Sequence, residues 1–344
     1  SPHPSCVAAR PWQKILINLN TKIMVININF NPLLIKQLLV ITIALLFTQA
    51  CMTDTKQNNE VDAAAKSENE IEIITTAMEF QMPDTITSGW NTWVYHNKSI
   101  FTHFILIDDY PNGITLDSVE QRVLPVFGSG MQLINEGNAE EGFAEFAKLP
   151  QWFSEVIWPG GVGLISPGLT AQTTLKLDPG YYLVECYVKM SSGMFHTNMG
   201  MIKELVVVDE ESSLEEPQAD VAISISSASG IEFEPPATAG NYTFSVHFLD
   251  QVPHENFLGH DLNLVKLAED ANEKVLEAWM DWRDPKGLID PAPEGFTFLG
   301  GVNDMPEGGK AYFTAQLEPG KYAMVSEVPN TLEKGLFKTF EVQE

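Results

Sequence analysis

Short runs in which apolar and polar residues alternate recur through the last three quarters of the chain, each bounded by Gly, Pro or Asn. Such runs are typical of strands that bury one face. In the first of two similar segments they fall at 93–95, 103–107, 171–177 and 181–188. The pattern predicts mainly short strands joined by turns.

The run at 181–188 also predicts where its cysteine points. Tyr182, Val184, Cys186 and Val188 occupy alternate positions and therefore share one face of the strand. If the two valines belong to the core, the sulfur of Cys186 lies between the sheets.

Helical spacing interrupts the strands once in each segment. Apolar residues recur at intervals of three and four over 116–123 and 140–153, and again over 275–282. Together the patterns predict an all-β fold, in which each segment is an antiparallel sandwich of about seven or eight strands with a helical insertion.

The two segments are also similar in sequence. Trp-Pro-Gly-Gly-Val at 158–162 corresponds to Phe-Leu-Gly-Gly-Val at 298–302, and Leu-Asp-Pro-Gly at 177–180 corresponds to Leu-Glu-Pro-Gly at 317–320. The offset is 140 residues in both cases. A period this long indicates two domains of one fold and is too long for a solenoid repeat.

Composition shifts place the boundaries of these domains. We expect an upstream and signal segment at 1–50, a disordered tether at 51–70, a first domain at 71–208, an acidic linker at 209–218 and a second domain at 219–344. The length of 344 residues is sufficient for two separate cores.

The upstream region contains an export-like segment. Residues 38–47 are almost all apolar, follow Lys36, and end in Thr-Gln-Ala before Cys51. About ten apolar residues are too few for a membrane-spanning helix. The segment resembles a bacterial lipoprotein signal, which implies a start at Met24, lipidation of Cys51 and anchoring in the cell envelope, on the periplasmic or outer-membrane face. A secretory signal cleaved nearby is the alternative.

The charge balance limits the partners. The formal net charge is −26, which argues against nucleic acid because phosphate binding needs a basic surface. A solvated acidic surface explains the charge, and a cationic redox partner is the alternative. We expect membrane contact only through the N-terminal lipid.

A lone thiol carries the candidate chemistry. Cys6 and Cys51 lie before and at the end of the export-like segment, so Cys186 has no partner for an intrachain disulfide. His196 and several methionines follow it within 15 residues. Thiolate, imidazole and thioether together favour a soft metal, copper first.

The order of His103, Cys186, His196 and Met201 resembles that of the cupredoxins, the blue copper proteins. The resemblance implies one type 1 copper, held in a plane by the two histidines and the thiolate, with Met201 as the weak axial ligand and Met199 as the second choice. It also implies that both domains are cupredoxin-like Greek-key sandwiches. The loop between Cys186 and His196 is longer than in small electron carriers and nearer to that of copper nitrite reductases.

The second segment lacks these ligands. Ser326 stands where the offset places the cysteine, Leu336 stands at the position of Met201, and no histidine follows His260. We therefore expect a degenerate domain without copper, kept for structure or partner binding.

The leading function is a one-electron carrier of the cell envelope that exchanges with an unidentified redox or copper-exchange protein. The alternatives are a Cu(I) storage or delivery protein that uses the methionine-rich loop, and a metal-free sandwich that binds a partner. The chain has no His-x-His pair for a catalytic copper and no catalytic triad motif, so we expect that it is not an enzyme.

Overall fold

The computed structural model describes residues 16–19, 22–25, 69–254, 259–281 and 284–344. These belong to two compact units, one within 1–64 and one within 65–344. The first unit contains the antiparallel strands β1 (Leu16–Leu19) and β2 (Lys22–Val25). The apolar segment 38–47, Cys51 and nearly all of the expected tether lie outside the described residues.

A search of the described part of the chain finds no helix with the length and apolar character needed to cross a membrane.

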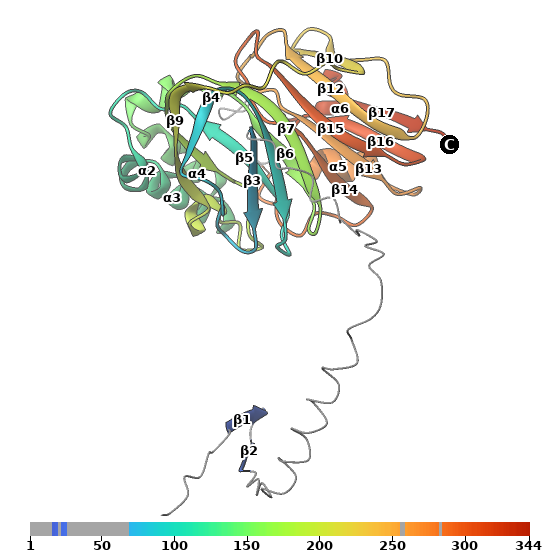
Figure 1. The fold of residues 1–344 in the computed structure, drawn as a ribbon. Coiled ribbons are helices and arrows are strands. Elements are labelled where there is room, and N and C mark those ends of the chain that lie inside the picture. Colours follow the sequence, from blue (N-terminus) through green and yellow to red (C-terminus); the bar gives the residue numbers. More distant parts are fainter. Residues whose placement is uncertain (1–15, 20–21, 26–68, 255–258, 282–283) are drawn as a thin grey trace, which may run out of the picture. The chain divides into compact units, whose positions relative to one another are not determined.

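Strands dominate the second unit, and the all-β prediction is confirmed (Figure 1). Within the described residues, its first half has seven strands: β3 (Glu70–Thr75), β4 (Thr85–Asn97), β5 (His103–Asp108), β6 (Gly161–Ile165), β7 (Thr170–Leu177), β8 (Gly180–Glu185) and β9 (Ile202–Glu211). Its second half has eight: β10 (Val221–Ser226), β11 (Gly230–Glu232), β12 (Gly240–Phe248), β13 (Leu262–Leu267), β14 (Phe296–Val302), β15 (Lys310–Leu317), β16 (Gly320–Val325) and β17 (Phe337–Val342).

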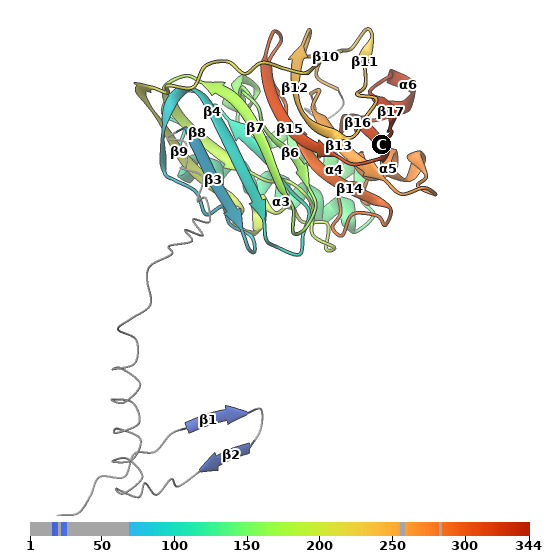
Figure 2. The ribbon, with the colours of Figure 1, turned by 45° about the vertical axis from the view of Figure 1, so that its right-hand side comes forward.

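Both sheets of the sandwich continue from one half into the other. One sheet has the order β3-β4-β7-β15-β12-β10-β11, and the other has β9-β8-β5-β6-β14-β13-β16-β17. The pairs β7–β15 and β6–β14 join the halves, and Figure 2 shows β4, β7 and β15 side by side. The start of β4 also pairs with β9, which links the two sheets.

The repeated Gly-Gly motif has a steric cause. Gly161 and Gly301 have φ values of 156° and 147°, which glycine adopts without strain. A Cβ atom at Gly161 would lie 1.9 Å from the carbonyl oxygen of Ile105, and one at Gly301 would lie 1.9 Å from that of Leu262. Only glycine therefore permits β6 and β14 to pass so close to β5 and β13.

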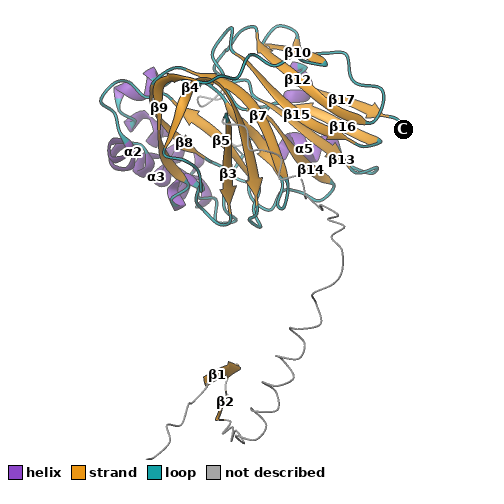
Figure 3. Cartoon of the chain, in the orientation of Figure 1, coloured by secondary structure: helices purple, strands orange, loops and turns teal. Residues whose placement is uncertain are grey.

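Helices occur where the spacing predicted them, with differences (Figure 3). The first insertion contains α2 (Leu116–Arg122), α3 (Leu124–Asn135), α4 (Ala139–Glu145) and two 3₁₀ turns, η1 (Phe146–Lys148) and η2 (Gln151–Glu155). The second half contains α5 (Glu273–Met280) and α6 (Thr331–Lys334). The helix expected at 140–153 is thus broken, and α3 was missed.

Close packing explains why α3 escaped the pattern. A Cβ atom at Gly142 in α4 would lie 2.6 Å from the carbonyl oxygen of Gly130 in α3. The glycines that allow this approach are poor helix formers. Tertiary contact therefore stabilises a helix that local propensity does not favour.

The expected acidic linker is not a free segment. Strand β9 continues to Glu211, and the Glu216 carboxylate accepts hydrogen bonds from Lys310 Nζ at 2.8 Å and from the Tyr312 hydroxyl at 2.5 Å. The Ser212 amide also donates to the Ser88 carbonyl of β4 at 2.8 Å, so the segment 209–218 is held against both halves of the sandwich.

Candidate metal centre

Three neighbouring backbone positions bring the candidate ligands together. His103 begins β5, and Cys186 directly follows β8, which ends at Glu185 rather than at Val188 as the alternation suggested. Strands β5 and β8 pair antiparallel, with Leu106 opposite Glu185, so the start of β5 faces the residues that follow β8. His196 precedes the 3₁₀ turn η3 (Thr197–Met199).

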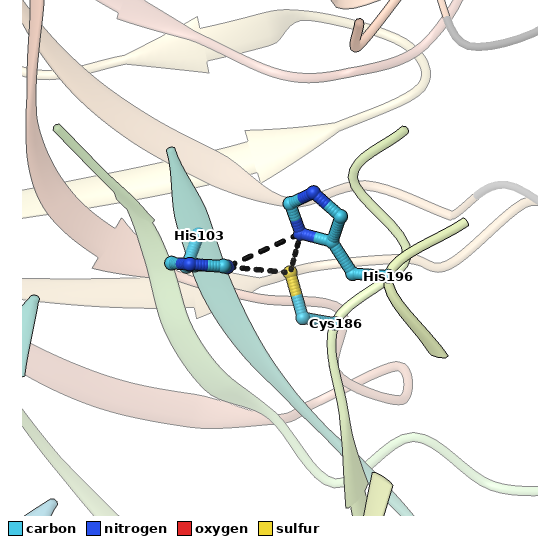
Figure 4. A group of neighbouring side chains, drawn as sticks. All are labelled: His103, Cys186 and His196. Atoms are coloured by element: carbon cyan, nitrogen blue, oxygen red, sulfur yellow. Dashed lines mark hydrogen bonds between the residues drawn. The ribbon is translucent and has the colours of Figure 1, made fainter. Parts of the chain in front are cut away.

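The side chains of His103, Cys186 and His196 point toward one another (Figure 4). The Cys186 sulfur lies 3.7 Å from Nδ1 of His103 and 3.6 Å from Nδ1 of His196, and the two Nδ1 atoms are 3.2 Å apart. A triangle with these sides has a centre about 2 Å from each corner, close to the bond lengths of first-row metals to imidazole nitrogen and thiolate sulfur. The spacing fits one metal ion in a trigonal plane.

Main-chain hydrogen bonds fix the loop that carries two of these residues. The His196 amide donates to the carbonyl of Val188 at 2.8 Å, and the Met201 amide donates to the carbonyl of His196 at 3.0 Å. The Cys186 amide donates to the Met201 carbonyl at 3.3 Å, and the Thr197 hydroxyl donates to the Cys186 carbonyl at 2.8 Å. The loop therefore holds the donor atoms in place without a metal.

Burial sets the protonation of the cluster. All three residues are fully buried. Burial, together with the neighbouring His196, lowers the pKa of His103 to about 3, and burial lowers the pKa of His196 to about 4. Burial raises the pKa of the Cys186 thiol to about 12. Both imidazoles are neutral ligands at pH 7, whereas the thiol needs a cation to lose its proton.

The donor set fits copper. Thiolate sulfur and imidazole nitrogen in a trigonal arrangement are the donors of blue copper sites. Backbone amides of Phe104 and Val188 lower the pKa of Cys186, and such donors stabilise a thiolate. Nε2 of His103 and of His196 is buried and has no hydrogen-bond partner within the described residues. The Nδ1 atoms face the Cys186 sulfur and are therefore the nitrogen atoms that could bind a metal.

The two candidate axial methionines differ in burial. Met201 is fully buried directly before β9 (Ile202–Glu211), and its carbonyl is hydrogen-bonded to Cys186. Met199 lies in η3 and is 54% exposed. The environment of Met201 is the one suited to a buried ligand.

Two neighbours of the site were not anticipated from the sequence. The Phe101 ring lies edge-on against the imidazoles of His103 and His196, with ring centroids 6.3 and 5.9 Å apart. Asn97 shapes the turn before His103, because its amide donates to the Phe101 carbonyl at 2.7 Å and to the Ile165 carbonyl at 3.0 Å. A buried Asn at the end of a strand was the available signal.

The second half of the sandwich covers the ligand loop. The Lys189 amide donates to the Leu288 carbonyl at 2.7 Å, and the Asp290 amide donates to the Lys189 carbonyl at 2.8 Å. The carboxylate of Asp290 accepts a hydrogen bond from the Thr102 amide at 2.6 Å, next to His103. No local sequence pattern connects these segments.

No protein-family model and no curated protein matches this chain. Similar solved structures include an auracyanin from Roseiflexus castenholzii, which is 17% identical, with 41% of this chain and 98% of the auracyanin covered and a TM-score of 0.25. Auracyanin A from Chloroflexus aurantiacus, named a "blue" copper protein, is 18% identical, with 40% and 97% covered and a TM-score of 0.25. A copper-containing nitrite reductase from Thermus scotoductus is 14% identical, with 80% and 61% covered and a TM-score of 0.20.

The strands of the described residues and their pairing establish the all-β fold. The comparisons correct one prediction. The expectation, drawn from missing motifs, that the chain is not an enzyme is wrong, because the similar structures include the nitrite reductase, multicopper oxidases and a laccase, which are enzymes. The lack of a His-x-His pair in the sequence does not decide between electron transfer and catalysis.

Proposed function

We propose that this chain binds one copper ion in a type 1 site and transfers single electrons. Nδ1 of His103, Sγ of Cys186 and Nδ1 of His196 would hold the copper, and the thioether of Met201 would be a further, weaker ligand. The convergence of these three donor atoms, with sides of 3.2 to 3.7 Å, is the observation that carries the proposal.

Copper bound there supplies a one-electron couple between Cu(II) and Cu(I). The chain's part is to hold its donors still. The hydrogen bonds from His196 to Val188 and from Met201 to His196 fix the loop, so a change of oxidation state requires little movement. Phe101 covers both imidazoles at their edges and limits the entry of water.

We further propose, as an interpretation of the sequence, that Cys51 is lipidated and anchors the protein in a bacterial cell envelope. The partner is a redox or copper-exchange protein, nucleic acid is not a partner, and the lipid is the membrane contact. Labelling cells with a fatty-acid probe tests the anchor. Label that persists in a Cys51→Ser variant would contradict it.

The visible spectrum of the purified protein titrated with Cu(II) tests the copper site. We expect one equivalent to produce an intense charge-transfer band from the Cys186 thiolate, and Cys186→Ser to abolish it. His96→Gln is the control, because His96 lies on β4 with its Nδ1 at Thr170, outside the proposed site, and should keep the band.

Other outcomes separate the alternatives. Preference for Cu(I), little colour with Cu(II) and dependence on Met194 or Met199 would favour copper storage or delivery. Failure to bind copper in either oxidation state would leave a partner-binding sandwich. A Cu(II) complex whose affinity survives Cys186→Ser would overturn the proposed electron carrier.

A further inference from the structure

A cavity of about 90 Å³ lies beside the metal centre, between the helical insertion and strands β5 and β8. Leu106 of β5 and Leu124 of α3 line it, and so does Thr197, next to the candidate ligand His196. Six aromatic side chains line it: Tyr110, Phe127, Phe153, Trp158, Tyr187 and Phe195. The cavity is thus mainly apolar and aromatic.

Three carboxyl groups also line this aromatic cavity. Asp108 ends β5, Glu185 ends β8, and Asp304 follows β14 in the second half of the sandwich. Asp108 is 1% exposed and Asp304 is 6% exposed. Among the described residues that form the wall, none is Lys or Arg. The carboxyl groups therefore meet no opposite charge in the wall itself.

Oxygen atoms of this wall lack hydrogen-bond partners. Asp108 accepts a hydrogen bond at Oδ1 from Trp158 Nε1 at 3.0 Å, but its Oδ2 has no partner in the described part of the chain. The same holds for Oδ1 of Asp304 and Oδ1 of Asn198 within the described ranges. An unsatisfied buried polar atom is costly, so three around one cavity indicate a missing donor.

We propose that this cavity binds a small organic cation, a primary alkylammonium of a few carbon atoms. Its N–H groups donate to the free oxygens of Asp108, Asp304 and Asn198, and its alkyl chain packs among the aromatic rings. Aromatic faces attract a cation. Burial raises the pKa of Asp108 and of Asp304 well above the ordinary value, and a bound cation stabilises the charged form of these carboxyl groups. The volume of about 90 Å³ suits a ligand of this size.

The geometry favours an organic cation over a metal ion. A metal needs several donor atoms close together, and in the described part of the chain the group of His, Cys, Asp and Glu side chains that meets this condition is His103, Cys186 and His196. The three carboxyl groups of the cavity are too dispersed for such a group, whereas an ammonium with an apolar body spans both kinds of wall. This site is distinct from the proposed copper function.

Calorimetric titration of the copper-free full chain with n-propylammonium chloride tests the proposal. We expect saturable binding, and affinity for the neutral isostere 1-propanol at least about tenfold lower. Asp108→Asn and Asp304→Asn each reduce the propylammonium affinity by about tenfold or more, because each removes a charged acceptor. Asp178→Asn is the matched control, since it makes the same charge change at an exposed turn.

Far-UV circular dichroism verifies that the variants fold. If either variant fails to fold, fluorescence provides a second test. Propylammonium should then quench or shift the tryptophan fluorescence of the wild-type chain, and this change should be absent in Trp158→Phe. No saturable binding of propylammonium, wild-type affinity in both Asn variants, or tighter binding of Mg²⁺ or Ca²⁺ would each overturn the proposal. Failure of copper binding leaves this test unaffected, because it is made without copper.

Discussion

The two halves of the sandwich keep the same main-chain frame around different side chains. In the first half, the Cys186 amide donates to the Met201 carbonyl at 3.3 Å. In the second half, the Ser326 amide donates to the Leu336 carbonyl at 3.0 Å. The hydrogen bond that closes the ligand loop therefore exists where no thiolate is available.

The same comparison identifies the counterpart of the second histidine ligand. The Met201 amide donates to the His196 carbonyl at 3.0 Å, and the Leu336 amide donates to the Thr331 carbonyl at 2.9 Å. Thr331 is fully buried, as His196 is. The closing turns 196–201 and 331–336 thus share a hydrogen bond, although ten residues lead from Cys186 to His196 and five lead from Ser326 to Thr331.

His260, the last histidine of the second half, has partners unlike those in the candidate metal centre. Nε2 of His260 lies 3.2 Å from the Asp250 carboxylate, and its Nδ1 lies 3.4 Å from Nε2 of His254. Ser326 donates to the Asp261 carboxylate at 2.8 Å. In the second half, side chains at these positions therefore form hydrogen bonds, whereas in the first half they are candidate metal ligands. Both halves thus share the main-chain hydrogen bonds that close this turn, whereas the group of His and Cys side chains that could hold a metal lies, among the described residues, in the first half.

The largest expected effect comes from making the first half resemble the second. His196→Thr copies Thr331 and removes one of the proposed donor side chains. We expect copper affinity to fall by more than about 100-fold, because losing a ligand costs more affinity than losing a residue that only supports a ligand. Competition with a chelator measures it. His96→Gln is the control, since His96 lies on β4 and its Nδ1 contacts Thr170. Unchanged affinity in His196→Thr would remove the imidazole from the site.

The second prediction uses pH to distinguish thiol from hydroxyl. The pKa values of about 3 for His103 and about 4 for His196 lie below neutrality, and that of Cys186, about 12, lies above it. Copper binding therefore releases one proton, from the thiol, and affinity rises about tenfold per pH unit between about pH 5 and 9. Residual binding in Cys186→Ser is expected to lack this slope. A wild-type affinity independent of pH would contradict thiolate ligation.

The third prediction concerns the axial position. Met201→Leu copies Leu336, and we expect copper to stay bound while the reduction potential rises, because more apolar surroundings disfavour Cu(II). The swap conserves volume, so the free energy of unfolding changes by less than about 1.5 kcal/mol. Voltammetry and denaturant unfolding measure both. Met199→Leu is the matched control, and a potential shift confined to that variant would assign Met199 as the axial ligand.

The fourth prediction, with a smaller expected effect, concerns the hydrogen bond between Tyr187 in the first half and Glu327 in the second half. The Tyr187 hydroxyl, next to Cys186, donates to the Glu327 carboxylate, next to Ser326. Burial raises the pKa of Glu327 well above its ordinary value, so its stabilising contribution is present below about pH 4.5 and is lost as the pH rises. Glu327→Gln removes that loss, and its melting temperature relative to wild type should increase from pH 5 to pH 8. Glu341→Gln, at an exposed position, should show no such trend.

The last prediction is that a cysteine added to the second half does not create a second copper site. Ser326→Cys restores a thiol to the second half, but Thr331 and Leu336 supply neither imidazole nor thioether. We expect the copper stoichiometry to remain one equivalent, measured by elemental analysis after desalting. A second tightly bound equivalent would show that a thiolate with His260 is sufficient.

Much of this architecture could be predicted from local patterns. The alternation around Cys186 placed its sulfur in the core, and the structure buries it together with Val184 and Val188. Strand and helix positions followed from periods of two and of three to four residues, because those periods reflect which face is buried. Helix α3 was not predicted, because its glycines weaken the helical pattern in the sequence. They are there because α3 packs closely against α4, and this contact leaves no periodic pattern in the sequence.

The sequence by itself determined which donor types are available and in what order along the chain, because ligand chemistry belongs to single residues such as His103, Cys186 and His196. Only the tertiary structure decided that their donor atoms lie 3.2 to 3.7 Å apart. It also brought Asp304 to the same cavity as Asp108, and the Leu288 carbonyl to the Lys189 amide. These contacts join segments about 100 to 200 residues apart, and sheet pairing and burial between the two halves, rather than any local pattern, fix such distances.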